Sequence, residues 1–334
     1  MITYDKGFSN PNYPTNIIGN HDKIIKEIIY PQLNDNDILV DTTWIRLDED
    51  LAKIINDSKI NSKRILCYTG ADWDHSFESP GEKPKFKHVF EALNECNVIH
   101  IGNRLGDYYF SFWVDFVYTH LDKFEQFDTF ELQSPLKHFM CLNRKPHRPR
   151  VEIVNSIEEN NLDKFGYVSL GGGGPYGNFL TLTTDIVNKD GDSAVGGDVG
   201  ITNDITSLGH INNWNSHFLN VVTETTVYTD VFITEKTLKP IIGKRPFIVL
   251  GDNNIYKLLQ DWGFDTFDDL FGTGYNNPDY QKRIDWIIEN LKDLSKQENL
   301  DKVLQELKPR LEHNYQQFLK VAISNRHKIT NLFG

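Results

Sequence analysis

Short apolar runs alternate with segments of helical periodicity along the chain, which is the pattern of an α/β protein. In the N-terminal half, strands are predicted at residues 37–43, 64–70 and 97–102, and helices at 48–58 and 87–96. Strands that alternate with helices favour a mainly parallel sheet. Ligands bind such sheets beyond the carboxyl ends of the strands, so polar residues that follow a strand are candidate site residues.

The pattern restarts after residues 133–135, where we place a domain boundary. A strand at 137–142, a helix at 150–160 and a strand at 166–170 are predicted next. The stretch 171–217 is rich in Gly, Asn, Asp and Thr, which predicts a loop-rich insertion. Beyond the insertion, amphipathic helices are predicted at 253–263, at 278–294 and from residue 300 onward.

A chain of 334 residues is long for one domain and suits two of about 150 residues each. We therefore predict an N-terminal domain at 1–134 and a C-terminal domain at 135–310. The last stretch, 311–334, is long enough to cross back to the first domain as a helix.

The stretch Val221–Gly251 carries the clearest signal, because it predicts a strand, a polar loop, a helix and a second strand. Glu235 and Lys236 fall on the first turn of that helix, where free backbone N–H groups and a partial positive charge suit a phosphate. The alternative is an ordinary crossover helix with Thr234 as its N-cap and Glu235 favouring the helix dipole. The residues alone leave both interpretations open.

Two blocks resemble a known family. The run that starts at Thr234, TEKTLKPIIGKRPFIVLG, resembles the C-terminal motif of the α-1,3-fucosyltransferases, and it is closer still to fucosyltransferase-like glycosyltransferases of bacteriophages and marine viruses. The run that starts at Phe139, FMCLNRKPHRPR, resembles the strand, Asn, basic loop and helix of the same family. The resemblance implies an α/β fold of two Rossmann-like domains facing a cleft, the GT-B glycosyltransferase architecture.

Carried over by position, the resemblance also implies a donor-binding set. Arg150 or Arg148 and Lys236 would bind the phosphates of a nucleotide, Glu235 the ribose, and Asn143 would make a polar contact. The complete set implied for donor binding is Asn143, Arg144, Arg148, Arg150, Thr234, Glu235 and Lys236.

Transfer of a sugar requires stabilisation of the departing diphosphate and a base for the acceptor hydroxyl. A metal on a D-x-D triplet is one solution, and only Asp72-Trp-Asp74 lies just past a predicted strand. The other solution stabilises the diphosphate with Arg, Lys and a helix N-terminus, and we expect this metal-free solution here. We expect no cofactor, because the nucleotide-diphosphate sugar is the donor substrate. The candidates for the base are Asp72, Asp74 and His75. Glu224, at the end of a strand, either approaches the donor sugar or caps the following loop.

The composition limits the kinds of protein that the chain can be. The formal net charge of −12 argues against a protein that coats nucleic acid, and the three cysteines, widely spaced, are typical of buried thiols in a reducing compartment. No apolar run is long enough for a signal peptide or a membrane span, so we expect a cytoplasmic protein, in the host cytoplasm if the chain is viral.

The functional hypothesis is an inverting, metal-independent glycosyltransferase. It moves a sugar from a nucleotide-diphosphate donor, with GDP-sugars favoured, to a hydroxyl of a glycan or of a hydroxylated base in viral DNA. The alternative is a non-catalytic carbohydrate- or nucleotide-binding protein that retains the fold.

Overall fold

The computed structural model describes residues 2–4, 23–32, 37–41, 64–68, 98–102, 108–124, 129–134, 136–143, 147–170, 208–209, 211–225, 227 and 231–331. The helices predicted at 48–58 and 87–96 lie outside these residues. The chain divides into two compact units, residues 1–116 together with 322–334, and residues 117–321. The units therefore separate before the boundary predicted near residues 133–135.

The first unit contains a parallel sheet of five strands whose order follows the chain. The strands are β1 (Ile2–Tyr4), β2 (Asp37–Asp41), β3 (Arg64–Tyr68), β4 (Val98–Gly102) and β5 (Tyr108–Tyr109). The strands predicted at 37–43, 64–70 and 97–102 are thus confirmed within two residues at each end.

Two short helical turns, a π-helix at Ile24–Ile29 and a 3₁₀ turn at Tyr30–Gln32, follow β1. The aromatic helix α4 (Phe112–Thr119) begins in the first unit and buries Phe112, Trp113 and Phe116 against one another. These rings form part of the core of the first unit.

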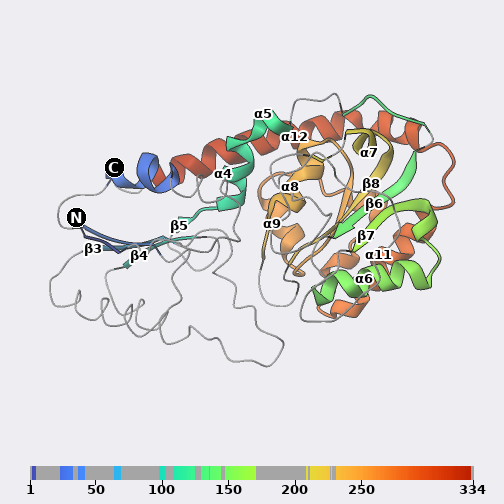
Figure 1. Ribbon diagram of the computed structural model, residues 1–334, viewed down its shortest axis with the longest axis horizontal. Coiled ribbons are helices and arrows are strands. Elements are labelled where there is room, and N and C mark those ends of the chain that lie inside the picture. The colour runs from blue at the N-terminus through green and yellow to red at the C-terminus, as the bar shows by residue number, and fades with distance from the viewer. Residues whose placement is uncertain are drawn as a thin grey trace. The chain divides into compact units, whose positions relative to one another are not determined.

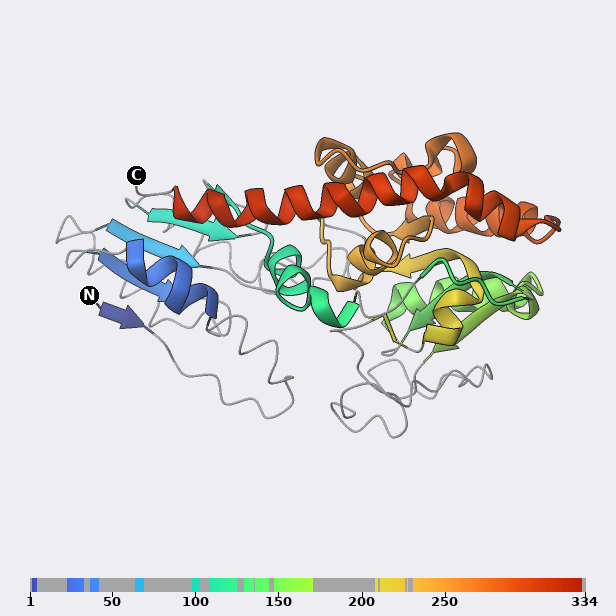
Figure 2. The ribbon, with the colours of Figure 1, turned by 90° about the horizontal axis from the view of Figure 1, so that it is seen from above.

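The end of the last helix, α12 (Leu300–Thr330), belongs to the first unit. Asn325 accepts a hydrogen bond from the Ser111 backbone N–H at 2.9 Å and donates one to the Ser111 carbonyl at 2.9 Å. Arg326 forms an ion pair with the buried carboxylate of Asp115. Asp115 is therefore structural. Figure 2 shows α12 as one continuous helix.

The second unit is built on a four-stranded parallel sheet in the order β7-β6-β8-β9. Its strands are β6 (Lys137–Asn143), β7 (Gly166–Leu170), β8 (His217–Thr223) and β9 (Phe247–Leu250). The chain leaves β6 toward β7 and then returns to the other side of β6 for β8. Such a reversal of strand order is a topological switch point, and sheets of this kind bind ligands beyond the carboxyl ends of the strands at that point.

Helices cover both faces of this sheet. Because parallel crossovers are right-handed, α6 (Arg148–Glu159), which leads from β6 to β7, and α8 (Glu235–Ile242), which leads from β8 to β9, lie on opposite faces. Helix α11 (Tyr280–Leu294) packs on the face of α6, and Figure 1 shows α6 and α11 together, with α8 on the other side. The α/β class with two parallel sheets is confirmed.

The remaining elements of the second unit are short. They are α5 (Leu121–Phe124), η3 (Asp163–Phe165), α7 (Ile211–Asn215), α9 (Ile255–Asp261), α10 (Asp268–Phe271) and η4 (Gly274–Asn276). Helices α9, α11 and α12 confirm the predictions at 253–263, 278–294 and from residue 300. Helix α7 lies within the stretch that was predicted to be loop. It was missed because its Asn-rich sequence has little helical propensity, and the burial of Trp214 stabilises the helix instead.

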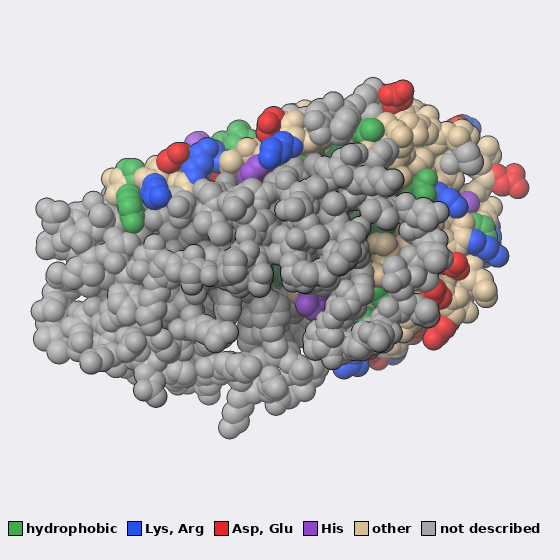
Figure 3. All heavy atoms as spheres, in the orientation of Figure 1, with side chains coloured by type: hydrophobic (Ala, Val, Ile, Leu, Met, Phe, Trp, Pro, Cys, Tyr) green, Lys and Arg blue, Asp and Glu red, His purple; other side chains and the backbone are tan. Residues whose placement is uncertain are grey.

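On the face shown in Figure 3, acidic and basic side chains of the described surface lie close together. Exposed ion pairs within a single helix include Lys257 with Asp261 in α9 and Lys292 with Glu289 in α11. Pairs of this kind contribute little to stability. No helix of the described residues is both long and apolar enough to cross a bilayer.

A buried polar network lies at the start of β8. The guanidinium of Arg245 is fully buried and donates to the carbonyls of His217 and Trp214 at 3.1 Å each. His217 Nδ1 lies 3.0 Å from the Asn213 carbonyl, and its Nε2 lies 2.8 Å from Asn220 Nδ2. The neutral ring with its proton on Nδ1 satisfies both contacts. Burial, reinforced by the charge of Arg245, lowers the pKa of His217 to about 3.

This network predicts a loss of stability in mild acid. In the unfolded chain His217 binds a proton below pH ~6.5, whereas in the folded chain it stays neutral down to about pH 3, so stability is complete above ~6.5 and falls with pH below that value. The free energy of unfolding from urea titrations should fall by up to ~1.4 kcal/mol per pH unit more steeply in the native chain than in a His217→Gln variant. Equal slopes would show that the ring takes up a proton in the folded state.

Candidate functional site

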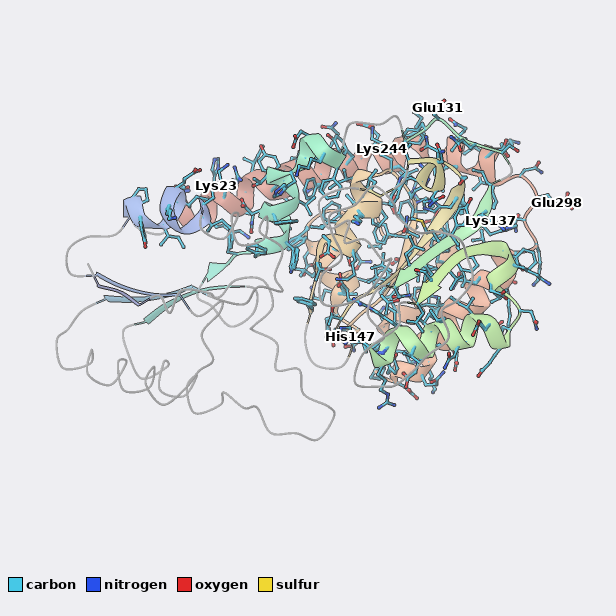
Figure 4. All side chains as sticks on the ribbon, viewed as in Figure 1. Lys23, Glu131, Lys137, His147, Lys244 and Glu298 are labelled. Carbon is cyan, nitrogen blue, oxygen red and sulfur yellow. The ribbon has the colours of Figure 1, made fainter. Side chains whose placement is uncertain are left out.

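The carboxyl ends of β6 and β8 lie side by side at one edge of the second sheet. Met140 pairs with Asn220, and continuing this register places Asn143 level with Thr223, the last residues of the two strands. In Figure 4, Lys137 at the start of β6 and His147 at the start of α6 mark the opposite edges of the sheet. The helices that follow β6 and β8 therefore both begin at the edge where the switch point lies.

Glu224 is the first residue after β8 and is fully buried. Its backbone N–H donates to the Leu250 carbonyl at 3.0 Å, which extends the ladder to β9. Its carboxylate accepts the Thr234 backbone N–H at 2.9 Å, the Thr234 hydroxyl at 2.8 Å and the Thr237 hydroxyl at 2.7 Å. Of the two roles that the sequence left open, this geometry favours capping of the following segment over approach to the donor sugar.

The N-terminus of α8 is organised around Thr234, which accepts the Lys236 backbone N–H at 3.3 Å and is the N-cap, as the crossover-helix alternative expected. The Lys236 ammonium lies 2.7 Å from the Thr234 hydroxyl oxygen, 3.4 Å from Glu235 Oε1 and 3.6 Å from Glu224 Oε2. Its side chain is 28% exposed. Lys236 is thus the shared counter-ion of two buried carboxylates and still faces solvent.

Glu235 is the residue beside it, with a side chain only 8% exposed. Its Oε2 is buried and has no hydrogen-bond partner among the residues that the structure describes. A buried carboxylate oxygen without a donor costs free energy of the order of 1–3 kcal/mol or more. A bound ligand can satisfy such an atom, and a sugar hydroxyl is a suitable donor.

The β6 side of the switch point supplies two buried polar residues, Asn143 and Arg150. Arg150, on the first turn of α6, is 5% exposed, and its Nη2 donates to the Thr225 hydroxyl just beyond β8 at 3.4 Å. Arg148 is instead 58% exposed and pairs with Glu152 on its own helix at 2.7 Å. The structure thus brings Arg150 to the end of β8 and leaves Arg148 at the surface.

Cys141, beneath these residues on β6, is buried as predicted for the chain's thiols. Burial raises its pKa to about 12, although a hydrogen bond from Asn143 opposes the shift. A buried thiol with a raised pKa stays protonated at neutral pH and is a poor nucleophile.

Three residues that contribute to this edge were not among the predicted ones. Thr225 contacts Arg150, and Thr237 donates to Glu224. Arg283 of α11 donates to the Val227 carbonyl at 2.6 Å and thereby anchors the segment between β8 and α8. A sequence signal for Arg283 existed, because it is a basic residue on the apolar stripe of its helix.

The remaining predicted residues, Arg144, Asp72, Asp74 and His75, lie outside the described residues, and their roles stay predictions. Within the described part of the chain, no group of His, Cys, Asp and Glu side chains is arranged to hold a metal ion.

Neither protein-family models nor curated proteins gave a match to the chain. Three solved structures are similar to it over most of its length. A crystal structure of α1,3-fucosyltransferase is 12% identical, with a TM-score of 0.46, 95% of this chain covered and 87% of that chain. The α1,3-fucosyltransferase with GDP is 12% identical, with a TM-score of 0.45, 98% of this chain covered and 94% of that one. The α1,3-fucosyltransferase with GDP-fucose is 13% identical, with a TM-score of 0.40, 90% of this chain covered and 79% of that one.

The contacts of Glu224 predict the effect of removing one of its donors. Thr237→Val keeps the shape of a fully buried side chain but deletes the hydroxyl that donates to the carboxylate at 2.7 Å. Hydrogen bonds to charged groups contribute about 1.5–3 kcal/mol, so urea unfolding should show a loss of that order. Thr273→Val, at an exposed position, should stay within ~0.5 kcal/mol of the native chain. A Thr237→Val variant as stable as this control would contradict the assigned network.

Proposed function

We propose that the chain is a glycosyltransferase that uses a nucleotide-diphosphate sugar and binds the diphosphate at the switch point of the second sheet. The observation that carries the proposal is the convergence of two basic residues there. Lys236 lies on the first turn of α8. Arg150 lies on the first turn of α6 and donates a hydrogen bond to Thr225, the residue that follows Glu224. Switch points of this kind are where doubly wound sheets take their nucleotides.

The chemistry of sugar transfer fits this set of residues. When the bond between the anomeric carbon and the diphosphate breaks, negative charge grows on the leaving phosphate oxygens. The Lys236 ammonium, the Arg150 guanidinium and the free N–H groups of the first turn of α8 would stabilise that charge without a metal ion. The acceptor oxygen bonds to the anomeric carbon from the opposite side, so the configuration inverts, and a base takes its proton.

Glu235 supports a ribose contact in the same site. Its buried Oε2 lacks a donor among the described residues, and it stands next to the lysine that would bind the phosphates. A ribose hydroxyl bound there would supply the missing hydrogen bond while the adjacent diphosphate contacts Lys236. The motif resemblance favours a guanine nucleotide and an acceptor hydroxyl on a glycan or on a modified base of DNA. Asp72, Asp74 and His75 are the candidates for the base, because they follow the strand predicted at 64–70.

A donor panel tests the proposal. We expect purified protein to gain thermal stability with one nucleotide diphosphate, GDP before UDP, and to release that nucleotide from its sugar conjugate when a suitable acceptor is present. Turnover should be unchanged by EDTA, because Arg, Lys and backbone amides carry the charge. Loss of turnover on chelation, restored by Mn²⁺, would assign the chemistry to a metal site instead. Binding of nucleotide with neither transfer nor hydrolysis would support a non-catalytic binding protein.

A further inference from the structure

The carboxylate of Glu224 has a complete set of donors, and this limits what the residue does. Thr234 and Thr237 supply three hydrogen bonds to it between 2.7 and 2.9 Å, and its side chain is closed to solvent. A carboxylate in this position cannot reach a sugar without losing those bonds. Its influence on a ligand must therefore pass through the residues that it holds.

The Thr234 hydroxyl provides the link from Glu224 to Lys236. A hydroxyl has one proton, and the shortest contact from Thr234 Oγ1 to a pure acceptor is to Glu224 Oε2, at 2.8 Å. An ionised carboxylate only accepts, so the proton points to Glu224 and the lone pairs of Oγ1 face the other way. Those lone pairs receive the Lys236 backbone N–H at 3.3 Å and the Lys236 ammonium at 2.7 Å.

We infer that Glu224 is a positioning residue for the phosphate-binding lysine, acting through the Thr234 hydroxyl. Glu224 fixes the direction of that hydroxyl, and the hydroxyl fixes both the first turn of α8 and the ammonium of Lys236. The inference rests on the proposed function, in which Lys236 binds the diphosphate. It assigns to Glu224 a role in binding without a contact to the ligand.

Whether replacement of Glu224 weakens or tightens phosphate binding distinguishes a positioning role from a purely electrostatic one. A buried negative charge 3.6 Å from the Lys236 ammonium opposes an anionic ligand, so its removal alone would tighten phosphate binding. If Glu224 positions the lysine, its replacement weakens binding. In Glu224→Gln the new amide donates hydrogen bonds, which turns the Thr234 proton toward Lys236 and releases the ammonium.

A double-mutant cycle with GDP as the probe, read by calorimetry, tests the inference. We expect Lys236→Ala to weaken GDP binding by about 10- to 100-fold, in line with the loss of a charged donor. Glu224→Gln should weaken it by about 10-fold in the native background and by less than ~2-fold when Lys236 is already Ala, because coupled residues are not additive. Glu289→Gln, at an exposed helix position, should leave the affinity unchanged.

Two further variants keep the test decisive if Glu224→Gln does not fold. Thr234→Ser retains the hydroxyl and should bind GDP within about 2-fold of the native chain, whereas Thr234→Val should lose about 10-fold, again only while Lys236 is present. Tighter GDP binding by Glu224→Gln, or equal losses in both backgrounds for either pair, would overturn the inference and leave the proposed function standing. An unchanged GDP affinity in Lys236→Ala, or no binding of GDP or UDP by the native chain, would overturn both.

Discussion

A buried carboxylate needs several donors, and in this chain that requirement fixes the point where a helix begins. Glu224 directly follows β8 inside the protein, and the hydrogen-bond partners of its carboxylate lie 10 and 13 residues further along the chain, at Thr234 and Thr237. If the buried carboxylate lost these hydrogen bonds, the unpaired charge would cost several kcal/mol, which is large beside the total stability of a domain. The first turn of α8 is therefore tied to the end of β8, and Lys236 and Glu235 are held at the carboxyl edge of the sheet.

The strand order places the start of α6 at the same end of the sheet as the start of α8. Because β8 returns to the side of β6 opposite β7, the first turns of α6 and α8 both lie at the end of the sheet where β6 and β8 finish. Arg150, from a segment far away in sequence, reaches Thr225 next to Glu224. Two cationic side chains that are far apart in the sequence thus contact neighbouring residues just beyond β8, Arg150 at Thr225 and Lys236 at Glu224. Neither residue alone distinguishes a nucleotide site from a capped helix, and their placement beside the same segment is the basis of the proposed diphosphate site.

The sequence predicted the regular elements well, because periodicity and capping are local properties. The strand at Gly166–Leu170 is confirmed residue by residue, and Thr234 is the N-cap that one of the two interpretations of this helix expected. Long-range choices could not be predicted in the same way. The sequence offered Arg148 and Arg150 as equals, and only the packing of α6 shows that Arg150 is buried while Arg148 lies at the surface. The anchoring of the segment after β8 by Arg283 likewise depends on where α11 packs.

The most direct test of the account is a crystal structure of the chain with GDP bound. We predict that the diphosphate lies at the carboxyl edge of β6 and β8, within hydrogen-bonding distance of Lys236 Nζ and the Arg150 guanidinium, with a ribose hydroxyl at Glu235. A nucleotide held entirely by residues 1–116, with Lys236 still on its own carboxylates, would contradict the account.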